Sequence, residues 1–154
     1  MRYRAALAMV LAVLMLPAAF PSAAVGGSGG DRLQEQAQAR INALRARSGL
    51  PALRRSENLT RSASAYARYM LRNDYFGHLP RIRASRRFSS VGEIILLHRG
   101  ARGQPRLAVS GWAGSPGHRS VMLSSRYHRI GVGKASGSFS GRRVTTWVVH
   151  VGRR

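Results

Sequence analysis

Two segments in the first half of the chain carry apolar residues at helical spacing. In the first segment they follow Asp31 and stop before Gly49, a residue suited to closing a helix: Leu33, Ala37, Ile41 and Leu44. In the second they follow Ser56, a residue type that caps helices, and stop before Asn73 and Asp74: Leu59, Ala63, Tyr66, Ala67 and Met70. The pattern therefore predicts two amphipathic helices, of which the second has the stronger apolar face.

Shorter apolar runs in the second half of the chain predict strands. Residues 91–97 form an apolar run that a single carboxylate, Glu93, interrupts, which is typical of a buried strand. Residues 130–135 and 144–151 are two further runs, and the segment between them has turn signals at Gly137-Ser138 and Gly141. We predict that these two runs pair as an antiparallel hairpin.

Two short helices are predicted between the first strand and the hairpin. Pro105 begins one that ends near Trp112. Ser115 and Pro116 begin the next, because serine can cap free amides and proline has no amide hydrogen to leave unpaired. His118 then lies in a first helical turn, either as a positioned histidine or as a plain surface residue.

Residues 1–24 have the features of a secretory signal peptide rather than of a folded element. Arg2 and Arg4 precede an apolar stretch, and small residues end at Ala24. We therefore expect export to the cell envelope or the exterior after cleavage, with residues 25–30 as a flexible linker. Residues 31–154 are expected to form a single domain.

The net charge and the absence of cysteine limit the classes of partner that the sequence supports. The chain has 26 basic and 5 acidic residues, a formal net charge of +21, and no cysteine. Such a surface attracts anionic polymers and anionic membranes at low salt, or its arginines are simply solvated. No sequence feature indicates specific nucleic-acid binding, a disulfide framework or a cysteine-ligated metal, and we expect a monomer.

Three polar residues stand out because of their neighbours. His78 follows the aromatic pair Tyr75 and Phe76, which we expect to bury and aim it, the alternative being a histidine in an exposed loop. Glu93 is the only acid among residues 75–154, so it requires a partner, either an arginine or a cleft. His150 shares a strand face with Val144, Thr146 and Val148, and we interpret it as a structural or surface residue.

Common catalytic motifs are not found. The sequence has no P-loop, no GxSxG elbow and no HExxH pair, and nothing singles out a nucleophile. No catalytic residue is therefore assigned, and no cofactor is expected to be required.

Taken in order, these segments resemble the CAP superfamily, which covers cysteine-rich secretory proteins, antigen 5 and pathogenesis-related proteins. The likeness spans about residues 33–152 and is nearest to the short, cysteine-free, exported bacterial branch. It rests on Asn42 to Arg45 with Gly49 to Leu53, the helix from Leu59 to Met70, Phe76-Gly77-His78, Gly92-Glu93, Trp112 to Arg119, and Ile130 to Gly133. The resemblance implies an α+β fold, a three-layer α-β-α sandwich around a small antiparallel sheet.

The resemblance also implies a cleft lined by His78, Glu93, Ser115 and His118. His78 and His118 match the family's two histidines, and Glu93 matches its Gly-Glu-Asn motif, although Ile94 replaces the asparagine. Ser115 stands where many eukaryotic members have a second glutamate. Two imidazoles and one carboxylate are a ligand set that a divalent cation such as zinc accepts, and with one carboxylate in a strongly basic protein the binding should be weak.

Three hypotheses for function follow, because the family has no single reaction. The favoured one is a secreted module that binds a lipid or a cell-envelope component through this cleft. The second is a protein that binds polyanions or membrane surfaces through its arginines. The third is a metal-assisted hydrolase that uses His78, Glu93 and His118.

Overall fold

The computed structural model describes residues 29–82, 84 and 88–154. The predicted signal peptide and residues 25–28 of the predicted linker lie outside the described residues. The elements follow the order α1 (Gly29–Arg47), β1 (Arg54–Arg55), α2 (Glu57–Arg72), β2 (Ser90–Arg99), α3 (Pro105–Gly114), α4 (Pro116–Met122), β3 (Arg129–Phe139) and β4 (Arg142–Arg153). None of the helices in these ranges is both long and apolar enough to cross a membrane.

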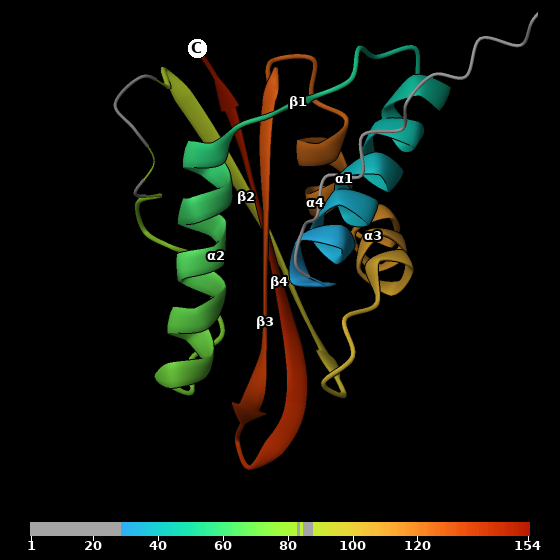
Figure 1. The fold of residues 1–154 in the computed structure, drawn as a ribbon. Helices are drawn as coiled ribbons and strands as arrows, with labels where there is room; N and C mark the ends of the chain where they lie inside the picture. Colours follow the sequence, from blue (N-terminus) through green and yellow to red (C-terminus); the bar gives the residue numbers. More distant parts are fainter. Residues whose placement is uncertain (1–28, 83, 85–87) are drawn as a thin grey trace, which may run out of the picture.

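The strands form one sheet between two helical layers. The strand order is β1-β3-β4-β2, and α2 covers one face of the sheet while α1, α3 and α4 cover the other (Figure 1). The β2–β4 and β3–β4 pairs are antiparallel. The predicted three-layer α-β-α sandwich is therefore confirmed, with one addition: the very short strand β1 pairs in parallel with β3.

Each helical layer packs on its own apolar core. The α2 layer contributes its predicted stripe, because Leu59, Ala63, Tyr66, Ala67 and Met70 are the buried residues of that helix. The opposite core is larger and contains Trp112, Trp147, Ile41 and Ile94. Strand β4 lies between the two cores, so every residue from Val144 to Gly152 is buried.

Most helix ends agree with the sequence, but α1 begins at Gly29, inside the predicted linker and before the predicted cap Asp31, and the capping contacts differ from expectation. Gly49 closes the C-terminal end of α1 with a φ of +68°, and Asn73 caps α2. Ser56 and Ser115 occupy the N-cap positions of α2 and α4, yet neither side chain makes a capping hydrogen bond. Only their carbonyl groups accept from the first helical turn, at the amides of Thr60 and Arg119.

The β3–β4 hairpin is longer than predicted. Its turn is formed by Ser140 and Gly141, which have φ values of +46° and +72°. Gly137 and Ser138 were predicted as part of the turn, but they lie within β3 and pair with Val144 and Arg143. Positive φ at both central residues is typical of tight hairpin turns, so the strands continue until they reach these two residues.

Two glycines of β3 allow α2 to lie directly against the sheet. A Cβ atom added to Gly131 would lie 2.1 Å from the backbone nitrogen of Thr60, and one added to Gly133 would lie 2.3 Å from the backbone carbon of Ala63. Helix backbone atoms cannot swing aside as a side chain can. Glycine is therefore required at both positions for this distance between α2 and β3.

Gly133→Ala is expected to lower the free energy of unfolding by about 2 kcal/mol, because overpacking at a rigid contact typically costs about 1–3 kcal/mol. Gly137→Ala on the same strand is the matched control. Its added carbon would approach only the flexible side chain of Leu71, at 3.2 Å. Urea unfolding of the two variants measures the difference, and equal stabilities would contradict a backbone contact at Gly133.

Candidate histidine site

Glu93 is a buried carboxylate at the centre of the candidate site. Its side chain is 5% exposed and projects from the edge strand β2. Oε1 accepts a hydrogen bond from the Leu79 amide at 3.1 Å and lies 3.0 Å from Nδ1 of His78. Oε2 lies 2.9 Å from Nε2 of His150. Among the residues that the structure describes, the partners of Glu93 are thus two histidines and an amide, and none of them is the arginine that was considered from the sequence.

These contacts keep Glu93 ionised. Burial of the carboxyl group acts to raise its pKa, while the hydrogen bonds from His150, the Leu79 amide and His78 act to lower it. The net effect is a pKa below the usual value for glutamate. Glu93 therefore carries a negative charge at neutral pH and acts only as a hydrogen-bond acceptor.

His150 completes the environment of Glu93. It is paired with Glu93 across β2 and β4, so their side chains leave the same face of the sheet, toward α2. The residue is fully buried, and Nδ1 has no hydrogen-bond partner in the described structure. Because an ionised Glu93 can only accept, Nε2 of His150 carries the hydrogen and donates it. The alternative that His150 lies at the surface was wrong, and its contact with Glu93 was not predicted.

His78 lies in the segment that follows α2 and is the exposed member of the group. Its side chain is 56% exposed, with Nδ1 held by Glu93. The expectation that Tyr75 and Phe76 bury His78 was wrong, since these two residues are themselves 45% and 42% exposed, and the alternative of an exposed histidine is correct. The backbone of this segment is instead held by α2, because the hydroxyl of the buried residue Tyr66 donates a hydrogen bond to the carbonyl of Gly77. Burial, followed by the charge of Glu93, raises the pKa of Tyr66 to about 12, so this hydroxyl stays protonated.

His118 lies beside His78, in the first turn of α4 as predicted. The two ring centroids are 6.1 Å apart, and the ring planes are inclined by 49°. Burial, and then the charge of His78, lowers the pKa of His118, so its imidazole is neutral at pH 7. Ser115, the N-cap of α4, is partly buried one helical turn before His118. We use the name histidine site for His78, Glu93, His118 and His150, which these contacts bring together, while Ser115 is related to them through its position on α4 before His118.

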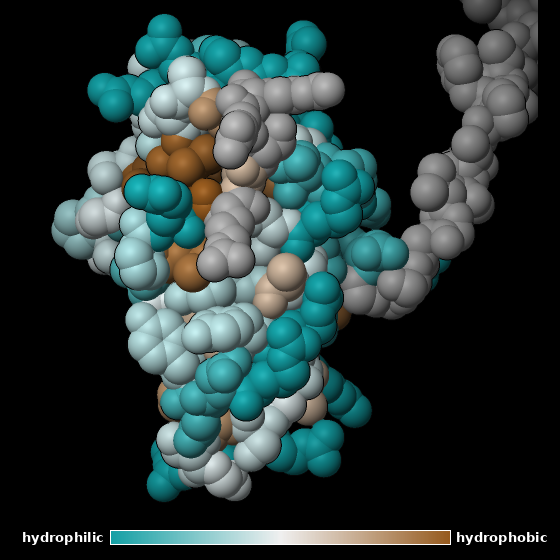
Figure 2. Space-filling view, turned by 90° about the vertical axis from the view of Figure 1, so that its left-hand side faces the viewer, coloured by the Kyte–Doolittle hydropathy of each residue, from teal (hydrophilic) through white to brown (hydrophobic). Residues whose placement is uncertain are grey.

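A pocket lies next to the histidine site on the outer side of α2. Its volume is about 410 Å³, and it is lined by Ser62, Ala65, Tyr66, Tyr69, Arg72 and Leu79. The rings of Tyr66 and Tyr69 are stacked, with centroids 6.0 Å apart. On this side of the molecule, hydrophobic surface is exposed among hydrophilic side chains (Figure 2). This tyrosine pocket shares Tyr66 and Leu79 with the surroundings of Glu93.

The present side-chain positions do not form a metal-ligand set. Among residues 29–82, 84 and 88–154, no three histidine, aspartate or glutamate side chains are grouped so that they could hold an ion. Both oxygens of Glu93 already accept hydrogen bonds, and within the described part of the chain the side chains that contact them are those of His78 and His150. A cation bound by His78, Glu93 and His118 would first have to displace one of these contacts.

Comparison with known proteins agrees with this architecture. The structure is similar to an outer surface protein from Borrelia burgdorferi, with a TM-score of 0.67 and 18% identity over 82% of this chain and 96% of that chain. It is also similar to an extracellular protein from Bacillus anthracis that contains an SCP domain, with a TM-score of 0.63 and 23% identity over 81% of this chain and 41% of that chain. A third similar structure is venom allergen-like protein 4 of Schistosoma mansoni, with a TM-score of 0.60 and 14% identity over 82% of this chain and 90% of that chain.

The family assignment comes from the sequence. No curated protein sequence is significantly similar to this chain. The family model described as CAP, the cysteine-rich secretory protein family, matches residues 38–151. This range contains both histidines, the glutamate and the serine of the predicted site. Together with the α-β-α fold, the match shows that this cysteine-free chain belongs to the CAP family.

Proposed function

We propose that this protein is an exported CAP-domain binding module that holds an amphiphilic lipid or cell-envelope component. The observation that carries the proposal is the position of the histidine site beside the tyrosine pocket. Leu79 lines this pocket and its amide donates to Glu93, and Tyr66 lines it and donates to the carbonyl of Gly77, next to His78. The pocket supplies aromatic and aliphatic surface for an apolar chain or ring. The histidine site supplies hydrogen-bonding groups for a polar end.

The charges in the histidine site limit which chemical group the polar end of the ligand can carry. Glu93 is ionised and buried, and His118 is neutral. A second negative charge placed against this carboxylate would be repelled. A hydroxyl or amide group fits better, because a neutral imidazole can donate to it or accept from it.

Mass spectrometry of the lipids that co-purify with the protein from the envelope of its native host identifies the ligand. His78→Ala and Tyr69→Ser are both expected to reduce the amount of bound lipid by about tenfold, since each removes one part of a two-part site. Leu107→Ser is the control, because Leu107 is also an exposed apolar residue and lies on α3. Retention that neither variant changes would contradict the proposal.

Salt dependence separates this proposal from binding through dispersed arginines. With a formal charge of +21, an arginine-driven interaction with anionic vesicles should weaken steeply and smoothly as salt increases, because each neutralised charge releases counterions. Binding through the histidine site should depend weakly on salt and should be lost in His78→Ala.

Export is part of the same proposal. The similar bacterial proteins named above include one described as an outer surface protein and one described as extracellular. Cleavage after Ala24 should release a protein that begins at Val25. The mass of the secreted protein tests this, and recovery of only the full-length chain in the membrane fraction would contradict it.

We expect weak zinc binding, because one carboxylate meets the field of many arginines and already has histidine partners. Calorimetric titration of the wild type and of Glu93→Gln checks this expectation. Equal binding by both proteins would exclude Glu93 as a ligand. No binding by either would leave a polar recognition site without metal and would remove the basis for the hydrolase hypothesis.

A further inference from the structure

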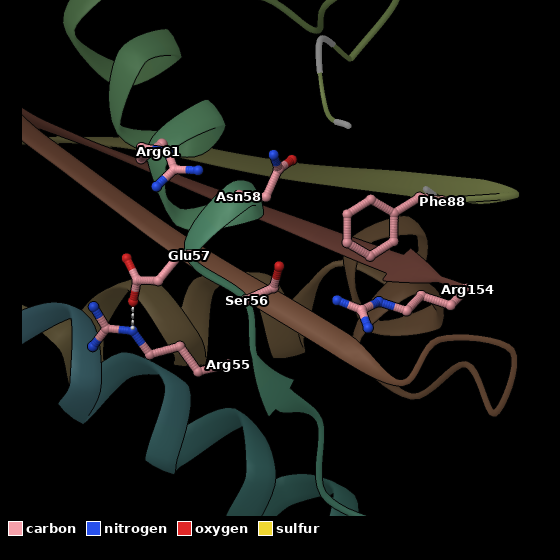
Figure 3. Close-up of a pocket in the computed structure, with 7 residues that line it drawn as sticks. All are labelled: Arg55, Ser56, Glu57, Asn58, Arg61, Phe88 and Arg154. Atoms are coloured by element: carbon pink, nitrogen blue, oxygen red, sulfur yellow. Dashed lines mark hydrogen bonds and ion pairs between the residues drawn. The ribbon is translucent and has the colours of Figure 1, made fainter. Parts of the chain in front are cut away.

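A second pocket, which shares no lining residue with the tyrosine pocket, lies at the start of α2. Its volume is about 530 Å³, and its lining comes from β1, α2, the segment before β2 and the end of the chain after β4: Arg55, Ser56, Glu57, Asn58, Arg61, Phe88 and Arg154 (Figure 3). The lining side chains include three guanidinium groups and one carboxylate. We call it the arginine pocket.

One arginine of the pocket is already neutralised, and two are not. Nε of Arg55 donates to Glu57 at 2.8 Å, and one of its terminal nitrogens donates to Glu35 at 3.1 Å. Arg61 and Arg154 make no side-chain hydrogen bond or ion pair with any described residue. The pocket therefore holds two positive charges whose hydrogen-bond donors are available to a ligand.

Phe88 gives the pocket an apolar wall. A Cβ atom added to Gly152 would lie 2.6 Å from Cδ1 of Phe88, so the ring lies directly on the backbone of β4. In Figure 3 the ring stands beside Arg154, whose guanidinium group points toward Ser56. An aromatic face next to guanidinium groups suits a ligand that is apolar or planar on one side and anionic on the other.

We propose that the arginine pocket binds the phosphate group of an organic phosphate ester. Guanidinium groups form paired hydrogen bonds with phosphate oxygens, and Arg61 and Arg154 reach the same pocket from distant parts of the chain. The start of α2 adds a favourable dipole, and the Ser56 hydroxyl makes no capping bond there. The organic part of the ligand lies against Phe88. This site is independent of the function proposed for the histidine site.

Titration with phenyl phosphate and with inorganic phosphate tests the pocket directly. Phenyl phosphate should bind more tightly than inorganic phosphate, because its ring can stack on Phe88. Arg61→Gln should weaken phenyl phosphate binding by about tenfold. Arg68→Gln should change it by less than about twofold, although it removes the same charge from an exposed site on the same helix. Phe88→Leu should reduce the preference for phenyl phosphate.

Two results would overturn the proposal. One is equal weakening in Arg61→Gln and Arg68→Gln, which would mean that only overall charge matters. The other is that the wild-type protein does not bind phenyl phosphate. Unchanged binding in His78→Ala is the expected result for a site separate from the histidine site.

Vesicles that contain phosphatidic acid identify the source of the phosphate. Sedimentation with these vesicles that is lost in Arg61→Gln and kept in Arg68→Gln supports a lipid headgroup as the ligand. Binding of phenyl phosphate without sedimentation supports a soluble phosphate ester. Sedimentation that both variants lose equally counts against the pocket.

Discussion

Arg45→Met is expected to lower the free energy of unfolding by roughly 3 kcal/mol, because it removes three hydrogen bonds made by a charged group, and the buried Met122 carbonyl left without a donor alone costs about 1–3 kcal/mol. The Arg45 side chain is fully buried in α1. It donates to the carbonyls of Pro51 at 3.0 Å, Met122 at 2.7 Å and Ser124 at 2.9 Å. This guanidinium group thus joins α1 to the following turn and to the C-terminal end of α4.

Arg47→Met is the matched control for this prediction. Arg47 lies on the same helix and is exposed, so its replacement should change stability by less than about 0.5 kcal/mol. Urea unfolding curves of both variants provide the measurement. Similar destabilisation in the two variants would show that Arg45 acts only through the total charge.

Glu93→Gln is expected to destabilise the fold by about 3 kcal/mol at neutral pH, because hydrogen bonds to a charged group contribute about 1.5–3 kcal/mol each. Glutamine carries no charge and has a single acceptor oxygen, so it cannot accept from His78, His150 and the Leu79 amide as Glu93 does. The folded-state pKa of Glu93 is lowered, so its stabilising contribution is fully present above its unfolded pKa of about 4.3. The contribution is lost as the pH falls through the lowered folded-state pKa. The stability difference between wild type and Glu93→Gln should therefore shrink in acid.

Unfolding measured at about pH 7 and about pH 3 checks both the size and the sign of this effect. Glu57→Gln is the control, because this carboxylate is 63% exposed and its pairing with Arg55 should contribute less than about 1 kcal/mol. A stability difference between wild type and Glu93→Gln that does not change with pH would contradict the hydrogen-bonded carboxylate described above.

Much of the fold could be predicted because its signals are local. The apolar stripe of α2 and the runs that became β3 and β4 follow from residue spacing within one element. The short strand β1 gave no such signal, since Arg54 and Arg55 are exposed and pair through their backbones. Tyr75 and Phe76 show the opposite error, because residue type alone indicated burial for a segment whose side chains remain exposed.

The site was predictable only in part, because its contacts depend on how distant strands align. Resemblance to the family identified His78, Glu93 and His118 before their positions were known. Alternation placed His150 on the correct face of β4. Alternation could not show that His150 pairs with Glu93 of β2, because the sequence of one strand does not determine its register with another strand.

The close packing of α2 on Gly131 and Gly133 bears on how the surface of the protein can be redesigned. Backbone contact with β3 holds α2 at Thr60 and Ala63, and the Leu71 side chain near its C-terminal end lies against Gly137, so the point at which residues 75–80 leave the helix is fixed. Sequence changes within that segment alter the surface around His78 without moving the scaffold beneath it. The fold thus separates a fixed support from a peripheral segment, which makes residues 75–80 the natural place to graft a new loop.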